Sequence, residues 1–218
     1  MKTKLPPMAA VAAVEFVLVA VLSIWLGVDF FSALPLMVSA IVMFMQTCVS
    51  RYAFLVGGAN SIIYSMSYFR MQLYGSAAYS LLVSFPLQML TFSNWKRSTH
   101  KGKTEIKRLS QKGRLMLFGV MAAAWLGLYA LFSLFGSPWL VLDNTVTVIG
   151  IVATVLCMLR YSEYSALQIV MNCVNLGMFA AMTKTDPTRA VWVVHSVYCM
   201  ICASVTFSKT HEGIKNDV

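Results

Sequence analysis

The stretch 159–182 reads LRYSEYSALQIVMNCVNLGMFAAM: an Arg-Tyr pair followed by an apolar segment with polar residues at helical spacing. The stretch 50–69, SRYAFLVGGANSIIYSMSYF, has the same order of features. Each Arg-Tyr pair follows an apolar run about as long as a bilayer is thick. We interpret the two stretches as copies of one membrane unit, an organisation typical of transporters whose solute site lies between two repeats.

The composition places nearly all of the chain in lipid. Of its 218 residues, 59% are hydrophobic and only 11% are charged, whereas soluble domains are about a quarter charged. A spanning helix needs roughly 20 mostly apolar residues. The apolar runs predict an all-α integral membrane protein with about eight transmembrane helices, over residues 8–28, 33–50, 53–69, 73–93, 115–136, 141–159, 163–182 and 188–207.

The distribution of basic residues predicts the orientation in the membrane. Fourteen of the 17 Lys and Arg residues fall on one side when eight spans are threaded, and eight of them lie in the single loop 94–114. The positive-inside rule then places this loop and both termini in the cytoplasm, as expected for a multi-pass protein of the cell inner (plasma) membrane. We interpret the basic loop as an orientation signal against anionic lipids, and expect no nucleic-acid partner.

Aligning the two Arg-Tyr pairs predicts two parallel three-helix repeats joined by one linking helix, a 3+1+3 core of the SWEET type. An odd-numbered triplet reverses the chain direction, so a single helix is needed between the copies. The predicted segments are an extra N-terminal helix (1–30), the first repeat (33–93), the basic cytoplasmic loop (94–114), the linking helix (115–137), the second repeat (141–207) and a cytoplasmic tail (208–218).

A polar stripe in the seventh predicted span indicates a solute path. Ser165, Gln168, Asn172 and Asn175 stand at i, i+3, i+7 and i+10, so they share one side of a helix. Amides in hydrocarbon are costly unless they find partners or line a wet cavity. The alternative is hydrogen bonding that only holds helices together. Amides both donate and accept, which suits a neutral solute.

Further candidate solute contacts lie in three other predicted spans. Asn60 and Tyr64 form a stripe in the third, and Gln88 follows Pro86, which is expected to bend the fourth. In the eighth, Trp192 and His195 share one face, although a lone membrane histidine is equally typical of a structural hydrogen bond.

The acidic residues do not form an enzyme site. Glu163 is expected to pair with Arg160 at i−3, and Asp143 to cap the helix that follows it. Glu15 lies in the first span with no partner identifiable from the sequence. Because nucleotide-hydrolysis, hydrolase and metalloprotease motifs are absent from the sequence, we expect no enzymatic activity, no cofactor and no metal. Facilitated diffusion without ion coupling is therefore the expected mode of transport.

The order and spacing of these motifs resemble the Pnu family of vitamin-precursor and nucleoside transporters over residues 33–207. The resemblance implies a SWEET-like fold, often a homotrimer, that passes an unphosphorylated vitamin or nucleoside by facilitated diffusion. Phosphorylation by a cytoplasmic kinase then traps the solute. The residues that carry the likeness are Arg51-Tyr52, Asn60, Met71-Gln72-Leu73-Tyr74, Pro86, Gln88, Trp95, Leu142-Asp143, Arg160-Tyr161, Glu163 and Asn172.

One departure from the family pattern bears on the substrate. PnuC-type members carry a W-x-x-W motif whose tryptophans contact nicotinamide riboside, and Ser165 and Gln168 stand at those positions here. Losing two stacking walls predicts a preference for a (deoxy)ribonucleoside. Thiamine, riboflavin and nicotinamide riboside are the alternatives within the family. The alternative class is a membrane regulatory or assembly subunit that transports nothing.

Overall fold

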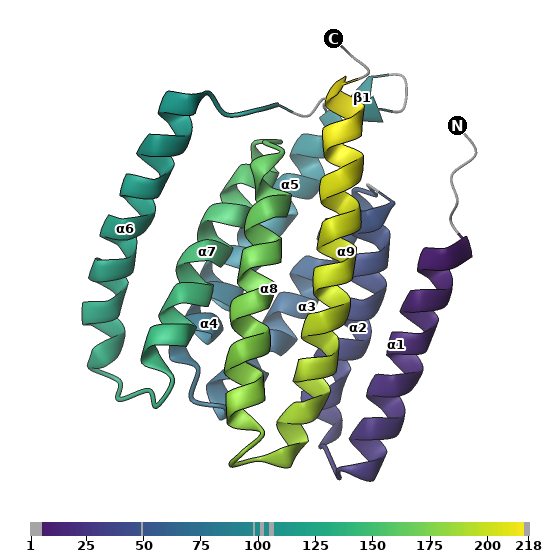
Figure 1. Ribbon diagram of the computed structural model, residues 1–218, viewed down its shortest axis with the longest axis vertical. Coiled ribbons are helices and arrows are strands. Elements are labelled where there is room, and N and C mark those ends of the chain that lie inside the picture. The colour runs from purple at the N-terminus through teal and green to yellow at the C-terminus, as the bar shows by residue number, and fades with distance from the viewer. Residues whose placement is uncertain (1–5, 49, 98, 101–102, 105–106, 216–218) are drawn as a thin grey trace.

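Long helices run side by side along the molecule and alternate in direction (Figure 1). The computed structural model describes residues 6–48, 50–97, 99–100, 103–104 and 107–215. Its helices are α1 (Pro6–Trp25), α2 (Phe30–Thr47), α3 (Tyr52–Arg70), α4 (Tyr74–Ala78), the π-helix η1 (Tyr79–Ser84), α5 (Phe85–Arg97), α6 (Gln111–Ser133), α7 (Leu140–Met158), α8 (Glu163–Met182), the 3-10 turn η2 (Pro187–Arg189) and α9 (Ala190–Lys215).

Helix α9 runs on to Lys215, well beyond the predicted end at residue 207, and the other helices match the predicted spans to within a few residues. The prediction of an all-α membrane protein is confirmed. Six of them are long and apolar enough to cross a membrane: α1, α2, α6, α7, α8 and the segment from η2 into α9. The other two passes are α3, which carries a polar stripe, and the pass that η1 divides into α4 and α5. The count of eight spans therefore stays a prediction.

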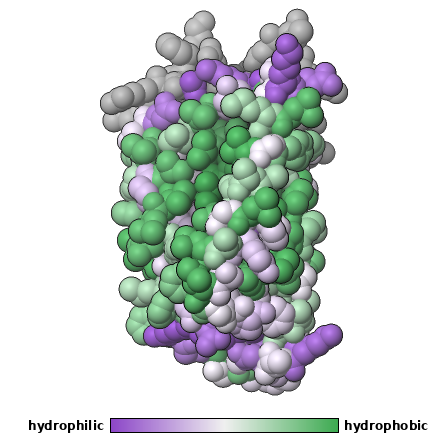
Figure 2. All heavy atoms as spheres, turned by 90° about the vertical axis from the view of Figure 1, so that its left-hand side faces the viewer, coloured by the Kyte–Doolittle hydropathy of each residue, from purple (hydrophilic) through white to green (hydrophobic). Residues whose placement is uncertain are grey.

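The face of the molecule on which α6 lies is apolar between two polar ends. Figure 2 shows this belt on the side where α6 lies. Helix α6 has one buried residue, Phe132, while Leu115, Phe118 and Leu126 are largely exposed. An exposed apolar helix of 23 residues is long enough to cross the hydrocarbon core and face lipid.

Two prolines shape the passes that carry polar residues. Pro35 inside α2 has no N–H to donate to the carbonyl of Phe31, and the Ser67 hydroxyl donates to that carbonyl instead, at 3.2 Å. Pro86 lies two residues after the end of η1, whose π-helical turns widen the helix just before the proline removes another donor. The bend predicted at Pro86 is thus a π-helical segment.

The helix packing places the first and last described helices, α1 and α9, in one bundle. Helix α2 packs between α3 and α9, and α5 packs between α3 and α7. Helix α8 lies between α7 and α9, while α1 covers α2 and α9, and α6 covers α7. The start of α1 and the end of α9 lie at the same end of the molecule, beside β1 (Figure 1).

The basic loop between α5 and α6 has more structure than the sequence indicated. It contains a two-stranded antiparallel hairpin of β1 (Thr99–His100) and β2 (Lys103–Thr104). Further along, the backbone of Lys107 bonds the turn between α7 and α8, at 2.7 Å to the Arg160 carbonyl and 2.9 Å from the Ser162 N–H. These bonds tie the loop to the helix turn that follows the second Arg-Tyr pair.

The expected ion pair between Arg160 and Glu163 is wrong. Glu163 instead pairs with Arg114, 3.0 Å away at the start of α6, and accepts a hydrogen bond from the Leu109 N–H. Arg160 has a φ of 64°, outside the helical region. That backbone reversal aims its carbonyl at Lys107, whereas Arg51 stays in a helical conformation. The two Arg-Tyr pairs therefore share their place between helices but differ in backbone conformation.

Basic residues at the opposite end of the molecule are paired with acids. Arg70 lies 3.4 Å from Asp29, and Arg189 lies 2.9 Å from Asp186. The hydrogen bond from the Ser32 hydroxyl, assisted by Arg70, lowers the pKa of Asp29. Both acids are therefore placed to offset a nearby positive charge, which sharpens the difference in charge between the two ends.

Asp143 is a cap, but not of the helix that the sequence suggested. Helix α7 begins at Leu140, and the buried Asp143 carboxylate reaches across to the start of α4. It accepts from the Gly75 N–H at 2.8 Å, the Ser76 N–H at 2.9 Å and the Ser76 hydroxyl at 2.5 Å. The interaction satisfies the free N–H groups that begin α4 and joins it to α7.

Asp143→Ala should destabilise the fold far more than Asp29→Ala, the matched cap variant at an exposed site. Losing a buried, charged acceptor with three donors is expected to cost about 3 kcal/mol or more, because the donors are left unsatisfied. The exposed cap at Asp29 should cost about 1 kcal/mol. Thermal unfolding in detergent measures both, and equal losses would contradict the bridging role of Asp143.

Candidate functional site

A cavity of about 170 Å³ lies in the middle of the bundle, between the α2–α5 group and the α7–α9 group. Its walls come from α2, α3, η1, α8 and α9, with smaller contributions from α4, α5 and α7. Segments far apart in sequence therefore meet there. No described residue that lines it is Asp, Glu, Lys or Arg, and His195 is its one histidine.

Eight of the nine residues singled out from the sequence line this one cavity: Asn60, Tyr64, Gln88, Gln168, Asn172, Asn175, Trp192 and His195. The exception is Ser165, which is fully buried outside the lining and donates its hydroxyl to the Ser162 carbonyl at 2.8 Å. The helical spacing placed it on the right side of α8 but one turn too close to the helix start.

Several lining side chains hold a buried polar atom that has no hydrogen-bond partner among the described residues. Buried polar groups in native proteins are nearly always bonded, so such atoms are informative when they gather in one place. In the lining they are Gln46 Oε1, Asn60 Oδ1, Gln168 Oε1, Asn175 Oδ1 and Trp192 Nε1. Four acceptors and one donor are thus unpaired in the side chains that surround the cavity.

Aromatic rings form one end of the cavity. Trp192 is 2% exposed and lies at the centre, with its ring 5.5 Å from Tyr68 and 5.1 Å from Phe179. Tyr64 stacks on Tyr68 at 5.4 Å and meets Trp192 edge-on. All four residues line the cavity, and α3, α8 and α9 supply them. They offer faces on which a planar ring can stack.

A small polar network holds Gln88 at the opposite wall. Its amide donates to Ser84 at 2.7 Å and to Ser61 at 3.0 Å, and the two serines contact each other. Gly57 permits this approach, because a Cβ there would overlap the amide oxygen of Gln88. The predicted contact residue Gln88 is therefore also part of the packing between α3 and α5.

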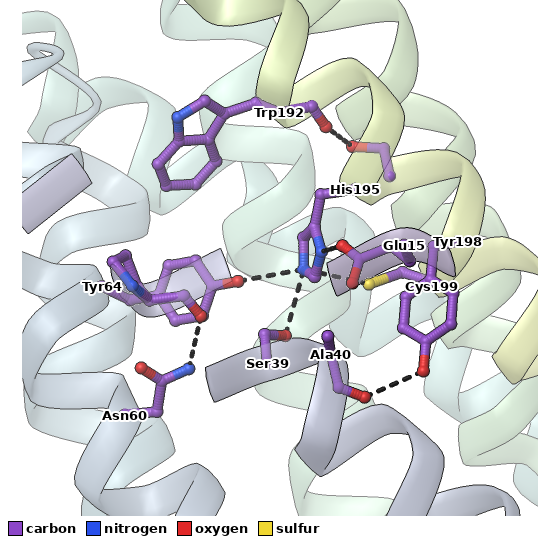
Figure 3. Close-up of polar contacts among 11 residues, drawn as sticks. Glu15, Ser39, Ala40, Asn60, Tyr64, Trp192, His195, Tyr198 and Cys199 are labelled. Carbon is purple, nitrogen blue, oxygen red and sulfur yellow. Dashed lines mark hydrogen bonds and ion pairs between the residues drawn. The ribbon is translucent and has the colours of Figure 1, made fainter. Parts of the chain in front are cut away.

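His195 is the most connected residue of the site (Figure 3). Its Nδ1 lies 2.8 Å from Glu15 Oε1, while its Nε2 faces the Tyr64 hydroxyl and the Ser39 hydroxyl, each at 3.1 Å. Glu15 is 3% exposed and comes from α1. Glu15, for which the sequence identified no partner, thus pairs with His195, and an acid within a span is itself a signal of function.

Apolar clusters pack on either side of the cavity, towards the two ends of the molecule. Leu36, Leu73, Met182 and Val191 pack around Trp192 at one end. Phe54, Trp95, Leu156 and Tyr164 pack at the other, where a smaller cavity of about 80 Å³ adjoins the first. The two cavities share Gln46, Tyr79, Gln88, Gln168 and Met171. A central polar site between two apolar barriers has the general form of a transporter.

Comparison with known proteins agrees with this class. A family model described as nicotinamide mononucleotide transporter matches residues 29–208. The nicotinamide riboside transporter PnuC of Neisseria mucosa is 32% identical over 164 residues, which cover 72% of this chain and 61% of that protein. The chain thus spans about three fifths of the length of this relative.

A solved structure, the crystal structure of the vitamin B3 transporter PnuC, has the same fold. It superposes with a TM-score of 0.73 at 20% identity, over 93% of this chain and 92% of that one. The chain belongs to the nicotinamide mononucleotide transporter family, which confirms the resemblance to the Pnu family. Members of this family are transporters and not enzymes, and the long apolar helices of this chain are those of a multi-pass membrane protein.

Gln168→Ala and Asn172→Ala should each weaken solute uptake while leaving the melting temperature nearly unchanged. One lost hydrogen bond to a neutral group costs about 1 kcal/mol, or roughly fivefold in affinity. Asn94→Ala is the matched amide control, since Asn94 lies outside the lining and donates to the Met158 carbonyl at 2.8 Å. Asn94→Ala should lower the melting temperature and leave uptake unchanged. If Gln168→Ala and Asn172→Ala instead lowered the melting temperature and left uptake unchanged, these amides would only join helices.

Proposed function

We propose that the protein is a uniporter that carries nicotinamide riboside by facilitated diffusion. The observation that supports this most is the aromatic group at the cavity beside a set of free amide oxygens. A pyridinium ring suits the faces of Tyr68 and Trp192, because aromatic faces attract flat and cationic rings. The amides suit the carboxamide and the ribose hydroxyls.

The absence of the W-x-x-W motif is weaker evidence against nicotinamide riboside once the cavity is known. Ser165 lies outside the cavity, and Gln168 contributes a polar atom to it. Stacking surface comes instead from Tyr64, Tyr68 and Trp192, on helices that the motif does not include. The comparisons also favour nicotinamide riboside over the neutral nucleoside that the sequence argument preferred.

The substrate is expected to be unphosphorylated. The family description names a mononucleotide and the Neisseria relative names the riboside, and these differ by one phosphate. A phosphate in low dielectric needs a cationic or strongly donating partner. The described lining contains no Lys or Arg, and the imidazole of His195 is engaged by Glu15. Uptake against a gradient would then depend on a cytoplasmic kinase that traps the riboside.

The helix packing supports a 3+1+3, SWEET-like arrangement with parallel repeats. In this proposal α2, α3 and α4–α5 form one triplet, α6 links, and α7, α8 and α9 form the other. The first helix of each triplet packs on the last of the other: α2 on α9, and α7 on α5. Such reciprocal contacts are expected from an axis along the membrane normal. A homotrimer is proposed from the family resemblance alone.

A typical ligand pocket is roughly 300–1,000 Å³, so a cavity of about 170 Å³ has to widen to admit a nucleoside. The π-helical η1 and Pro86 lie beside the lining residues Ser84 and Gln88. Irregular helix turns of this kind are common at functional sites. We place the flexible element of the transport cycle there.

A reporter fused after Val218, or inserted near Lys103, should report a cytoplasmic position in a bacterial inner membrane. The reason is that fourteen of the 17 basic residues fall on that side of the predicted topology. A reporter inserted next to Lys184, between α8 and α9, is the control and should report the opposite side. The same signal at all three positions would contradict the proposed topology.

The decisive experiment is uptake of labelled solutes into proteoliposomes. Nicotinamide riboside should enter faster than thymidine, thiamine or riboflavin, and nicotinamide mononucleotide should be excluded. Rates should not change with an imposed proton or sodium gradient. Faster thymidine uptake would support the second candidate, a neutral nucleoside transporter, which the four free amide oxygens favour. A protein that binds none of these solutes in thermal-shift assays would support a regulatory or assembly subunit.

A further inference from the structure

We propose that Glu15, on the extra helix α1, is a positioning residue of the solute site, which acts through His195 to make the Tyr64 hydroxyl a hydrogen-bond acceptor towards the cavity. The inference rests on the proposed function for the identity of the solute, whereas the contacts from which it is argued do not depend on that function. The family model begins its match at residue 29, so α1 lies outside the segment that defines the family.

The first step is the contact between α1 and α9. Glu15 is 3% exposed, and its Oε1 lies 2.8 Å from Nδ1 of His195. An ionised carboxylate can only accept, so Nδ1 carries the proton of that hydrogen bond. In the neutral imidazole, Nε2 is then left as an acceptor, and the tautomer of His195 is set by a residue that does not itself line the cavity.

The second step concerns the groups around Nε2. Three groups lie within reach: the hydroxyl of Tyr64 and that of Ser39 at 3.1 Å, and the thiol of Cys199 at 3.3 Å. Each of them has a proton to give. An accepting Nε2 draws the Tyr64 proton towards itself, and the lone pairs of the Tyr64 oxygen then face the cavity. With the opposite tautomer, Nε2 would donate and Tyr64 would turn its proton to the solute.

The third step concerns charge. His195 is the only described partner of the Glu15 carboxylate, and Glu15 Oε2 has no hydrogen-bond partner among the described residues. The described lining contains no other formal charge. In the proposed state, with Glu15 ionised and His195 neutral, a negative charge behind the imidazole acts on the cavity through a low dielectric, where charges interact more strongly than in water. A cationic solute that donates hydrogen bonds, as a pyridinium nucleoside does, fits this site better than a neutral one.

The test compares Glu15→Ala, Glu15→Asp and His195→Gln in proteoliposomes, with labelled nicotinamide riboside and thymidine. Glu15→Ala should raise the KM for nicotinamide riboside about tenfold and that for thymidine less than threefold. Glu15→Asp should recover most of the loss, and Glu15→Ala should add nothing in a His195→Gln background. Val19→Ala, one turn along the buried side of α1, is the packing control and should leave both KM values unchanged.

A solute-independent measurement separates this inference from the proposed function. With His100 and His211 replaced by Gln, nitrogen-15 NMR of labelled histidine reports His195 alone, since the chain has 3 histidines. The expected state has a protonated Nδ1 and a bare Nε2, and Glu15→Ala should shift it. A protonated Nε2 in the parent protein, or no change in Glu15→Ala, would overturn the inference. Absence of nicotinamide riboside uptake with the expected spectrum would overturn only the proposed function.

Discussion

The structure depends on one constraint of the bilayer: a polar group in hydrocarbon has no water to bond, so the protein must supply its partner. Three contacts show how this is done. Ser67 donates to the carbonyl that Pro35 leaves free, and Asp143 satisfies the N–H groups that begin α4. Asn60 donates its amide to the Pro35 carbonyl at 2.8 Å. These bonds allow irregular helices at membrane depth, and irregular helices make room for a central cavity.

The same constraint makes a buried polar atom without a partner costly, so such atoms are candidates for contact with a solute. Gln168 and Asn175 on α8 and Trp192 on α9 each keep one such atom, and all three residues line the central cavity. By contrast, Asn94 donates to the backbone carbonyl of Met158 on a neighbouring helix and lies outside the cavity. Amides in this chain therefore serve two purposes. Some join neighbouring helices, and others line the cavity.

Much of this could be predicted from the sequence, because hydropathy and helical spacing are local properties. They located the helices, and they selected eight residues that meet in one cavity. Long-range partners could not be predicted in the same way. The pairing of Asp143 with α4, of Glu163 with Arg114 and of Glu15 with His195 depends on how helices far apart in sequence are packed. Ser165 was misplaced because a stripe along α8 extends beyond the cavity that only part of it faces.

The comparisons favour the alternative substrate, nicotinamide riboside, over the predicted nucleoside, and the fold offers a related reason. Absent tryptophans at positions 165 and 168 imply a site without stacking surface only if that surface must come from α8. In the fold, Tyr64 and Tyr68 on α3 meet Trp192 on α9. A motif records which residues one helix contributes, whereas binding depends on the walls that all helices form together. Helix α1 is a further example, because Glu15 on this helix contacts His195 on α9, which lines the cavity.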